Sequence, residues 1–398
     1  MVNQKMSALG NKRSVIREIF EYGKIRSAEI GADKVFDFSL GNPSVSPPEE
    51  VKTAIAELNR TTEAIKLHGY TSAQGDFEAR KAVADSINDR FGVGISAEAI
   101  YMTCGAAASL TVSLKALCND GDEVILFAPY FTEYKVFVEN AGATAVIVSP
   151  TADFMIDAQD LESKITKRTK AVIINSPNNP SGVVYTEEVV REVVGVLNKK
   201  QAELSQEIYL IADEPYRELC YDGVEAPYLM NYYDNTLVCY SYSKALSIPG
   251  ERIGYIAVNP KMKDGREVYS AVCGAGRSLG YVCAPSTFQQ VIKRCINAKV
   301  NVQAYKRNRD LLYGSLTELG FECVKPDGAF YLFVKSPLGS AEEFYLKARE
   351  KEILIVPCAD FGAPDYVRIA YCVDESKIVA SLPAFRSLAE QIFGKTAK

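Results

Sequence analysis

Six short, continuously apolar runs between residues 123 and 259 place the strongest limit on what this chain can fold into. Continuous rather than alternating hydrophobicity indicates strands with both faces buried, as in a parallel sheet covered by helices. The stretches 105–117 and 186–204 are expected to be helices, the second opening with a threonine N-cap and acidic residues. Strands that alternate with helices predict an open α/β layer. The runs are 123–129, 144–150, 170–177, 208–212, 236–241 and 253–259.

The pattern changes after residue 285. Residues 286–320 carry apolar side chains at helical spacing, which predicts one long helical stretch. Residues 321–334 indicate two short strands about a Pro-Asp-Gly turn. With a helix expected near residues 13–30, these segments predict a smaller α+β domain. We expect three parts: residues 1–45 joining the small domain, 46–285 forming the large domain and 286–398 forming the small C-terminal domain.

Charge and cysteine usage argue against several classes of partner. Lysine and arginine total 45 against 50 aspartates and glutamates, a net charge of -5, whereas nucleic-acid binders are usually basic. The ten cysteines form no C-x-x-C pair and there is one histidine, which argues against a zinc site and fits a reducing cytoplasm. No apolar run approaches the ~18 residues of a membrane span, and the N-terminus lacks the apolar core of a signal peptide. We therefore expect a cytoplasmic protein without metal, nucleic-acid or membrane partners.

Chemically active side chains cluster where the predicted strands end. In open α/β sheets, ligands bind beyond the carboxyl ends of the strands. The residues that follow the apolar runs supply an amide, a carboxylate, a phenol, a lysine and an arginine, beside an aromatic ring and a small-residue helix start. Because parallel strands end at one edge of a sheet, we expect these residues to form one site. They are Gly105, Ala106, Ala107, Phe131, Asn179, Asp213, Tyr216, Ser241, Ser243, Lys244 and Arg252.

This set of residues matches the demands of a phosphorylated aromatic aldehyde. A lysine near Arg252 has its ammonium form disfavoured, so the amine of Lys244 is available as a nucleophile toward a carbonyl. A buried carboxylate such as Asp213 needs a cationic partner, and a protonated ring nitrogen would serve. The helix start at 105–107, with Arg252 and the two serine hydroxyls, would hold a phosphate, and Phe131 would stack on a flat ring. Pyridoxal phosphate combines these features.

Motifs spread from about residue 40 to 370 resemble those of the class I/II aminotransferases of the aspartate aminotransferase superfamily, which are fold type I pyridoxal-phosphate enzymes. Their order along the chain matches the family throughout. The resemblance implies an α/β fold in which a large pyridoxal-phosphate-binding domain, with a mostly parallel sheet between helices, carries a smaller α+β domain. The motifs are 40–43 (LGNP), 70–75 (YTSAQG), 105–107 (GAA), 179–182 (NPSG), 213–216 (DEPY), 241–244 (SYSK), 252–255 (RIGY), 326–331 (PDGAFY) and 368–370 (RIA).

The resemblance also implies roles around the cofactor. Lys244 would carry the internal Schiff base and later move a proton between the substrate Cα and the cofactor. Asp213 would pair with the pyridine nitrogen and keep it protonated. Tyr216 and Asn179 would hydrogen-bond the phenolic oxygen of the ring. Lys244, Asp213 and Tyr216 are therefore the expected catalytic residues.

Further roles implied by the resemblance concern the substrate and the assembly. Arg368 would clamp the substrate α-carboxylate through its planar fork, helped by Asn179 and the backbone at Gly41. Tyr70 would reach the cofactor phosphate of a neighbouring subunit, which implies a homodimer. Arg277 is a weaker candidate for contact with a distal substrate carboxylate. The histidines that flank the cofactor in some members of the family are absent here.

The implied reaction is ping-pong transfer of an amino group between an L-amino acid and a 2-oxo acid, with an aspartate-type substrate as the first expectation. A C–S β-lyase or another fold type I reaction uses the same lysine, aspartate and phosphate site, so the motifs do not separate these outcomes. A non-catalytic effector-sensing domain of a transcription regulator is a different alternative. The acidic composition argues against it, since such proteins carry a basic DNA-binding module.

Overall fold

All six apolar runs form strands of one seven-stranded sheet. The structure, a computed structural model, describes residues 2–12 and 14–394. In the sheet, β8 is antiparallel to β2 and β7, and the remaining neighbours are parallel, so the predicted mostly parallel sheet is confirmed. The order is β2-β8-β7-β6-β5-β3-β4. The strands are β2 (Ile100–Thr103), β3 (Glu123–Phe127), β4 (Thr144–Val148), β5 (Thr169–Asn175), β6 (Tyr209–Asp213), β7 (Thr236–Ser241) and β8 (Gly254–Val258).

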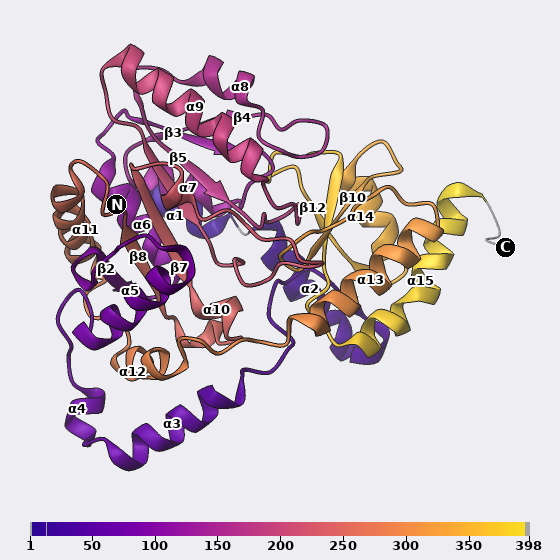
Figure 1. Cartoon of the computed structure of the whole chain (residues 1–398). Helices are drawn as coiled ribbons and strands as arrows, with labels where there is room; N and C mark the ends of the chain where they lie inside the picture. Colours follow the sequence, from indigo (N-terminus) through magenta and orange to yellow (C-terminus); the bar gives the residue numbers. More distant parts are fainter. Residues whose placement is uncertain (1, 13, 395–398) are drawn as a thin grey trace.

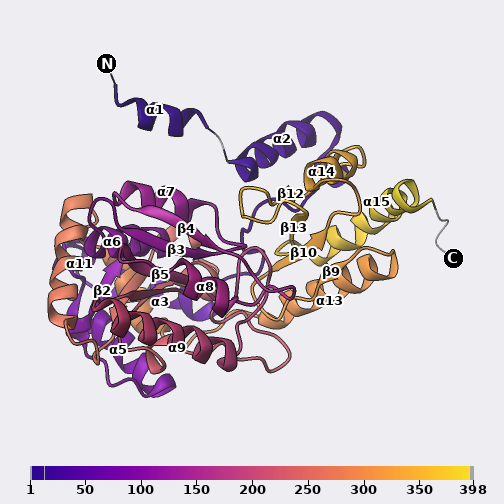
Figure 2. The ribbon, with the colours of Figure 1, turned by 90° about the horizontal axis from the view of Figure 1, so that it is seen from above.

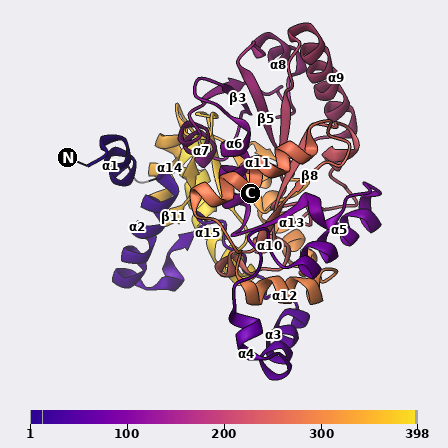
Figure 3. The same cartoon turned by 90° about the vertical axis from the view of Figure 1, so that its left-hand side faces the viewer.

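Helices cover both faces of this sheet because its strands are apolar on both sides. Val124 and Leu126 of β3 join a core with one helical layer, and Ile125 between them joins the core on the opposite face. The first layer holds α6 (Ala106–Leu117), α7 (Glu133–Asn140) and α11 (Gly265–Leu279), the last crossing the front of the larger lobe in Figure 3. The second layer holds α5 (Phe77–Phe91), α8 (Ala158–Lys164) and α9 (Glu187–Leu204).

A smaller lobe lies to the right in Figure 1 and contains two further sheets. A four-stranded antiparallel sheet has the order β12-β13-β10-β9, and β1 from the N-terminal segment pairs in parallel with β11. The strands are β1 (Phe36–Asp37), β9 (Cys323–Val324), β10 (Tyr331–Lys335), β11 (Ile353–Leu354), β12 (Val356–Pro357) and β13 (Tyr366–Ala370). The helices of this lobe are α2 (Val15–Ile30), α13 (Val302–Glu318), α14 (Ala341–Arg349) and α15 (Glu375–Phe393).

The prediction of a single helical stretch over 286–320 is wrong. The chain forms α12 (Ser286–Cys295) and then starts α13, because the side chain of Asn301 accepts a hydrogen bond from Ala304 N and caps a new helix. Helix α12 packs against α3 (Glu49–Thr61) and α5 of the larger lobe. We therefore propose that the large domain extends through α12, beyond the boundary expected at residue 285.

The N-terminal helix expected near residues 13–30 is present as α2, with Ser14 as its N-cap, while residue 13 lies outside the described residues. A short helix, α1 (Gln4–Asn11), precedes α2 at the top of Figure 2, and its Lys5 forms an ion pair with Glu139 of α7 at 3.5 Å. Helices α3 and α4 (Ala64–His68) extend from the larger lobe at the bottom of Figure 1. Across residues 2–12 and 14–394, none of the helices combines the length and apolar character needed to cross a membrane.

Candidate active site

A cavity of about 280 Å³ collects nearly all the residues that the sequence predicted for one site. The last residues of β5, β6 and β7 line it, as expected for ligand binding at the carboxyl edge of the sheet. Strands β10 and β13 of the smaller lobe close it with Tyr331 and Arg368, so the cavity lies where the lobes meet. The predicted residues that line it are Gly41, Ala106, Ala107, Phe131, Asn179, Asp213, Tyr216, Ser241, Ser243, Lys244, Arg252 and Arg368.

Lys244 enters the cavity from α10 (Tyr242–Ala245), the short helix that directly follows β7. Its Nζ donates a hydrogen bond to Gly41 O at 2.7 Å. Burial, helped by the nearby cations Arg252 and Arg368, lowers the pKa of Lys244 to about 8. About a tenth of the amine is therefore neutral at pH 7, and this neutral form can act as a nucleophile and a base.

Asp213, at the end of β6, is 4% exposed and holds one oxygen ready for a partner. Its Oδ2 accepts a hydrogen bond from Tyr134 of α7, whereas Oδ1 is buried and has no partner among the described residues. Burial raises the pKa of Asp213 to about 7. A buried carboxylate oxygen without a donor is costly, so this atom fits a cationic N–H group of a ligand.

The start of α6 forms a cradle for an anion. Gly105 is the N-cap of this helix and offers no side chain, so the first backbone N–H groups of α6 are free of a capping oxygen. A Cβ at Gly105 would lie 3.1 Å from Arg252 Nη2, and its φ of +90° favours glycine. Ser241 Oγ donates to Ser243 Oγ at 2.9 Å on the same side of the cavity. A phosphate suits this combination of helix N-terminus, guanidinium and hydroxyls.

Arg368 is held at the opposite end of the cavity by both lobes. Its Nη1 donates to Asn179 Oδ1 at 3.0 Å and its Nη2 to Ser39 O at 2.7 Å. The guanidinium lies over the ring of Tyr331 at 4.5 Å from the centroid, and its buried Nε has no partner among the described residues. A fixed guanidinium with a free donor fits a carboxylate.

Tyr216 meets Tyr331 at the boundary between the lobes. Their hydroxyl oxygens are 2.9 Å apart. Burial raises the pKa of Tyr216 well above its usual value, so its phenol stays protonated and can donate a hydrogen bond. Gly41 lies against the same ring, because a Cβ there would lie 2.1 Å from Tyr331 Oη. A glycine is therefore required at this position.

Several residues fall outside the expectations. Tyr70 is 98% exposed and does not line the cavity, and Arg277 is an exposed residue of α11 that is also absent from its lining.

Four residues line the cavity although the sequence analysis assigned them no role. They are Tyr134, Asn175, Tyr331 and Ile16. The motif at 326–331 contained Tyr331, so its place in that motif was the available signal. Asn175 stands at the end of a predicted strand, where ligand contacts were expected, whereas Tyr134 and Ile16 stand at positions that no motif marks.

The sequence is similar to those of known proteins. The sequence profile of the family described as "Aminotransferase class I and II" matches residues 33–382. The chain belongs to this family. The aminotransferase is 32% identical over 360 residues to the aspartate/prephenate aminotransferase of Thermus thermophilus, covering 87% of this chain and 89% of that one.

Solved structures agree with this membership. An amino transferase from Eubacterium rectale is 53% identical to the aminotransferase, with a TM-score of 0.96 over 98% of this chain and 99% of that one. The aspartate aminotransferase of Thermus thermophilus with maleate is 27% identical, with a TM-score of 0.85 over 98% and 99% of the two chains. The α/β architecture is therefore that of the fold type I transferases, and the aminotransferase is a pyridoxal-phosphate enzyme, as its family is.

Proposed function

We propose that the aminotransferase transfers an amino group between an L-amino acid and a 2-oxo acid in a ping-pong reaction, with pyridoxal phosphate held on Lys244. The observation that carries this proposal is the pairing, in one cavity, of a lysine of lowered pKa with a buried carboxylate whose Oδ1 lacks a partner among the described residues. The amine of the lysine needs a carbonyl to react with, and the buried carboxylate needs a cation as its partner. The aldehyde and the protonated ring nitrogen of pyridoxal phosphate supply both.

The residues present fit this cofactor along its whole length. Asp213 Oδ1 would accept a hydrogen bond from the ring nitrogen, and Tyr216 and Asn179 would hydrogen-bond the phenolic oxygen. Phe131 would stack on the ring. The phosphate would be held by Arg252 and by the remaining predicted groups of the cradle, which are Gly105, Ala106, Ala107, Ser241 and Ser243. When bound, pyridoxal phosphate supplies an electron sink for the electrons left at the substrate Cα.

The chain itself positions the substrate and moves its proton. Arg368 binds the α-carboxylate through its fork, with Asn179 fixing the guanidinium. Lys244 Nζ, freed when the substrate amine takes its place, would lie on the Gly41 side of the cavity and remove the proton from Cα, because its pKa of about 8 leaves it partly neutral.

An aspartate-type amino donor is our first candidate for the substrate. Two observations support it: the Thermus thermophilus relative is named an aspartate/prephenate aminotransferase, and a related solved structure carries maleate, which is a four-carbon dicarboxylate. Half-reaction spectra with aspartate, an aromatic amino acid and alanine identify the donor. Release of pyruvate and ammonia from a cysteine conjugate without an oxo acid would instead favour the β-lyase alternative.

We also propose that the aminotransferase acts as a homodimer in the cytoplasm. Tyr70 is exposed beside other exposed apolar side chains of the same region, including Ile65 and Phe77, as expected for a surface covered by a second subunit. From the partner, Tyr70 would reach the phosphate of the cofactor. The ten cysteines are free thiols, which supports a reducing compartment.

The decisive test of the proposed function is Lys244→Ala. Purified wild type is expected to bind pyridoxal phosphate as a yellow chromophore that borohydride fixes to the protein, whereas the variant is expected to form no reducible adduct. Mass spectrometry of the reduced protein locates the attachment. Attachment at another lysine, or an unchanged adduct in the variant, would refute the assignment of Lys244.

A further inference from the structure

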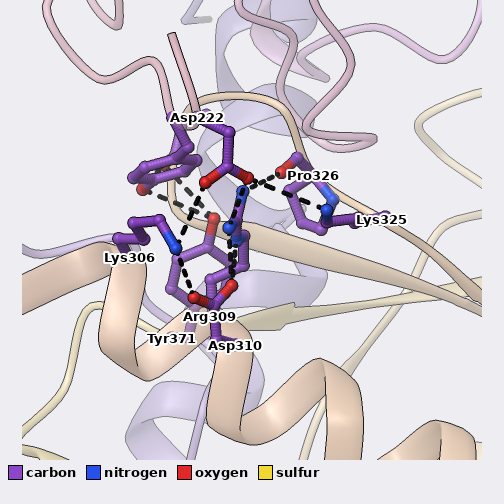
Figure 4. A network of polar contacts seen from close by, with 9 residues as sticks. Asp222, Lys306, Arg309, Asp310, Lys325, Pro326 and Tyr371 are labelled. Carbon is purple, nitrogen blue, oxygen red and sulfur yellow. Dashed lines mark hydrogen bonds and ion pairs between the residues drawn. The ribbon is translucent and has the colours of Figure 1, made fainter. Parts of the chain in front are cut away.

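A buried arginine outside the cavity, Arg309 of α13, joins the two lobes. Its side chain is 2% exposed, and its donors reach two segments outside its own helix as well as the neighbouring Asp310. Nη2 donates to Asp222 Oδ2 at 2.8 Å, Nη1 to Pro326 O at 3.1 Å and Nε to Asp310 Oδ1 at 2.8 Å. Figure 4 shows these contacts converging on the guanidinium. None of the proposed catalytic steps uses this residue.

Asp222 is the counterion that anchors Arg309 to the larger lobe. Hydrogen bonds from Arg309 and then from Lys306 lower the pKa of Asp222 to about 2, so the carboxylate is ionised at neutral pH. The guanidinium also lies over the ring of Tyr221, 4.8 Å from its centroid. Asp222 and Tyr221 belong to the segment that follows Tyr216 of the cavity. Arg309 therefore connects α13 to a segment that leads directly into the site.

The turn 325–329, which Arg309 contacts through Pro326 O, is also held by the larger lobe. Asp327 N and Gly328 N both donate to Gly182 O at 3.0 Å, which ties the turn to the loop that carries Asn179. The same turn is bonded to the segment after Tyr216. There, Tyr221 N donates to Asp327 O at 2.9 Å, and the hydroxyl of Tyr221 donates to the carbonyl of residue 329.

This turn leads straight into the substrate end of the cavity. Two residues beyond it is Tyr331, whose hydroxyl lies 2.9 Å from that of Tyr216 and whose ring supports Arg368. The neighbour of Arg309 on α13, Asn308, donates to Tyr371 O at 2.9 Å, just beyond the strand that carries Arg368. A displacement of α13 or of the turn would therefore be transmitted to the Tyr331–Arg368 pair.

We propose that Arg309 is a positioning residue, which acts through the turn 325–329 to hold Tyr331 and Arg368 in the geometry that accepts the substrate α-carboxylate. The inference rests on the proposed function, since it assigns the α-carboxylate to Arg368. Asp213, Ser241 and Arg252 have no hydrogen bond to the turn or to Arg309 among the described residues. Loss of Arg309 should therefore weaken substrate binding more than cofactor binding.

The test compares Arg309→Lys and Arg309→Met with Arg307→Met. Arg307 lies on the same helix, is 60% exposed and pairs with Glu375 at 3.4 Å, away from the turn, so it is a matched control. We expect KM for the amino acid to rise about tenfold in the Arg309 variants. A misplacement of about 1 Å at a site can lower the reaction rate ~100-fold, so a smaller shift of Tyr331 and Arg368 is enough for this effect. The Kd of pyridoxal phosphate should change much less than KM, because Asp213, Ser241 and Arg252 make no hydrogen bond to the turn.

Two further measurements separate positioning from general stability. The half-reaction with an amine that lacks a carboxylate should be unchanged in the Arg309 variants. Calorimetric binding of maleate, a carboxylate probe that needs no turnover, should weaken in parallel with KM. If Arg309→Met does not fold, Arg309→Lys and Asp222→Asn carry the test, the latter with a smaller effect in the same direction.

The outcomes are distinct. A lowered melting temperature with unchanged KM and unchanged maleate binding would overturn the inference, and so would parallel losses of cofactor and substrate affinity. If wild type binds maleate but transaminates no amino acid, the proposed function falls, while the maleate affinities of the Arg309 variants still decide whether this residue positions the carboxylate site.

Discussion

Tyr134 and Asp213 show how single residues set the chemistry of the cavity. The hydroxyl of Tyr134 occupies one carboxylate oxygen and leaves Oδ1 of Asp213 free for a cation. The same hydrogen bond opposes the effect of burial, since it lowers the pKa that burial raises. A carboxylate with one oxygen fixed and one free is therefore prepared for a partner with a single N–H group.

Replacement of Asp213 by Asn should remove a pH-dependent loss of folding stability from the apo-protein. The pKa of this carboxyl is about 7 in the fold against an ordinary 3.8, so the stability it contributes is fully present below the ordinary value and is lost as pH rises through about 7. Relative to wild type, the apo variant should gain stability between about pH 4 and 8, by up to about 4 kcal/mol at 1.36 kcal/mol per pH unit. Urea unfolding at both pH values measures this difference.

The cofactor supplies the control for that prediction. Bound pyridoxal phosphate offers the cation that Asp213 lacks, so its addition at pH 8 should stabilise wild type more than Asp213→Asn. Parallel unfolding curves for the two apo-proteins across the pH range would contradict the role given to this carboxyl.

At the scale of elements, the start of α6 depends on a single glycine. The positive φ of Gly105 and its closeness to Arg252 mean that an added Cβ would strain the backbone and crowd the guanidinium. The cradle is therefore a property of the helix start and its neighbour β8 together, as Gly254 of β8 packs directly against Gly105.

Gly105→Ala should weaken the hold on phosphate specifically. We expect the Kd of pyridoxal phosphate to rise about tenfold, since strain of this kind costs of order 1–3 kcal/mol. Binding of pyridoxal, which lacks the phosphate, should change much less. Gly195→Ala in α9 is the matched control, because nothing lies within 4 Å of a Cβ there and the position is helical. Equal losses for both ligands would argue against an anion cradle.

At the scale of the whole molecule, the cavity exists because two lobes meet. Arg368 of the smaller lobe donates to Asn179 of the larger one, and Tyr331 meets Tyr216 across the same boundary. Sites between lobes can also draw on a neighbouring subunit, which is the role proposed for Tyr70.

Tyr70→Phe should separate assembly from cofactor binding. We expect the variant to sediment as a dimer like wild type, because the ring and its apolar contacts remain, while the Kd of pyridoxal phosphate rises several-fold, about 1–2 kcal/mol for a lost hydrogen bond to a charged group. Tyr281→Phe, in the same exposed region, is the control. A monomeric wild type would refute the proposed dimer.

The strands, the helices and the cavity residues differ in how well the sequence predicted them. The apolar runs predicted every strand from β3 to β8, because burial on both faces leaves a continuous signal in the chain. The break between α12 and α13 was missed, since the capping role of Asn301 is a local geometry that a run of helical spacing conceals. The cavity residues predicted from strand ends nearly all line the cavity, because parallel strands end at one edge.

The sequence by itself determined the layered fold and the place of Lys244, of Asp213 and of the phosphate cradle in one site. Each of these features depends on residues that are close in the chain or on strand ends that any parallel sheet brings together. Only the tertiary structure decided that Tyr134 serves Asp213, that Tyr331 supports Arg368 and that Arg309 ties the lobes together. These contacts join segments far apart in the chain, and their geometry is determined by the packing of complete elements rather than by any local pattern.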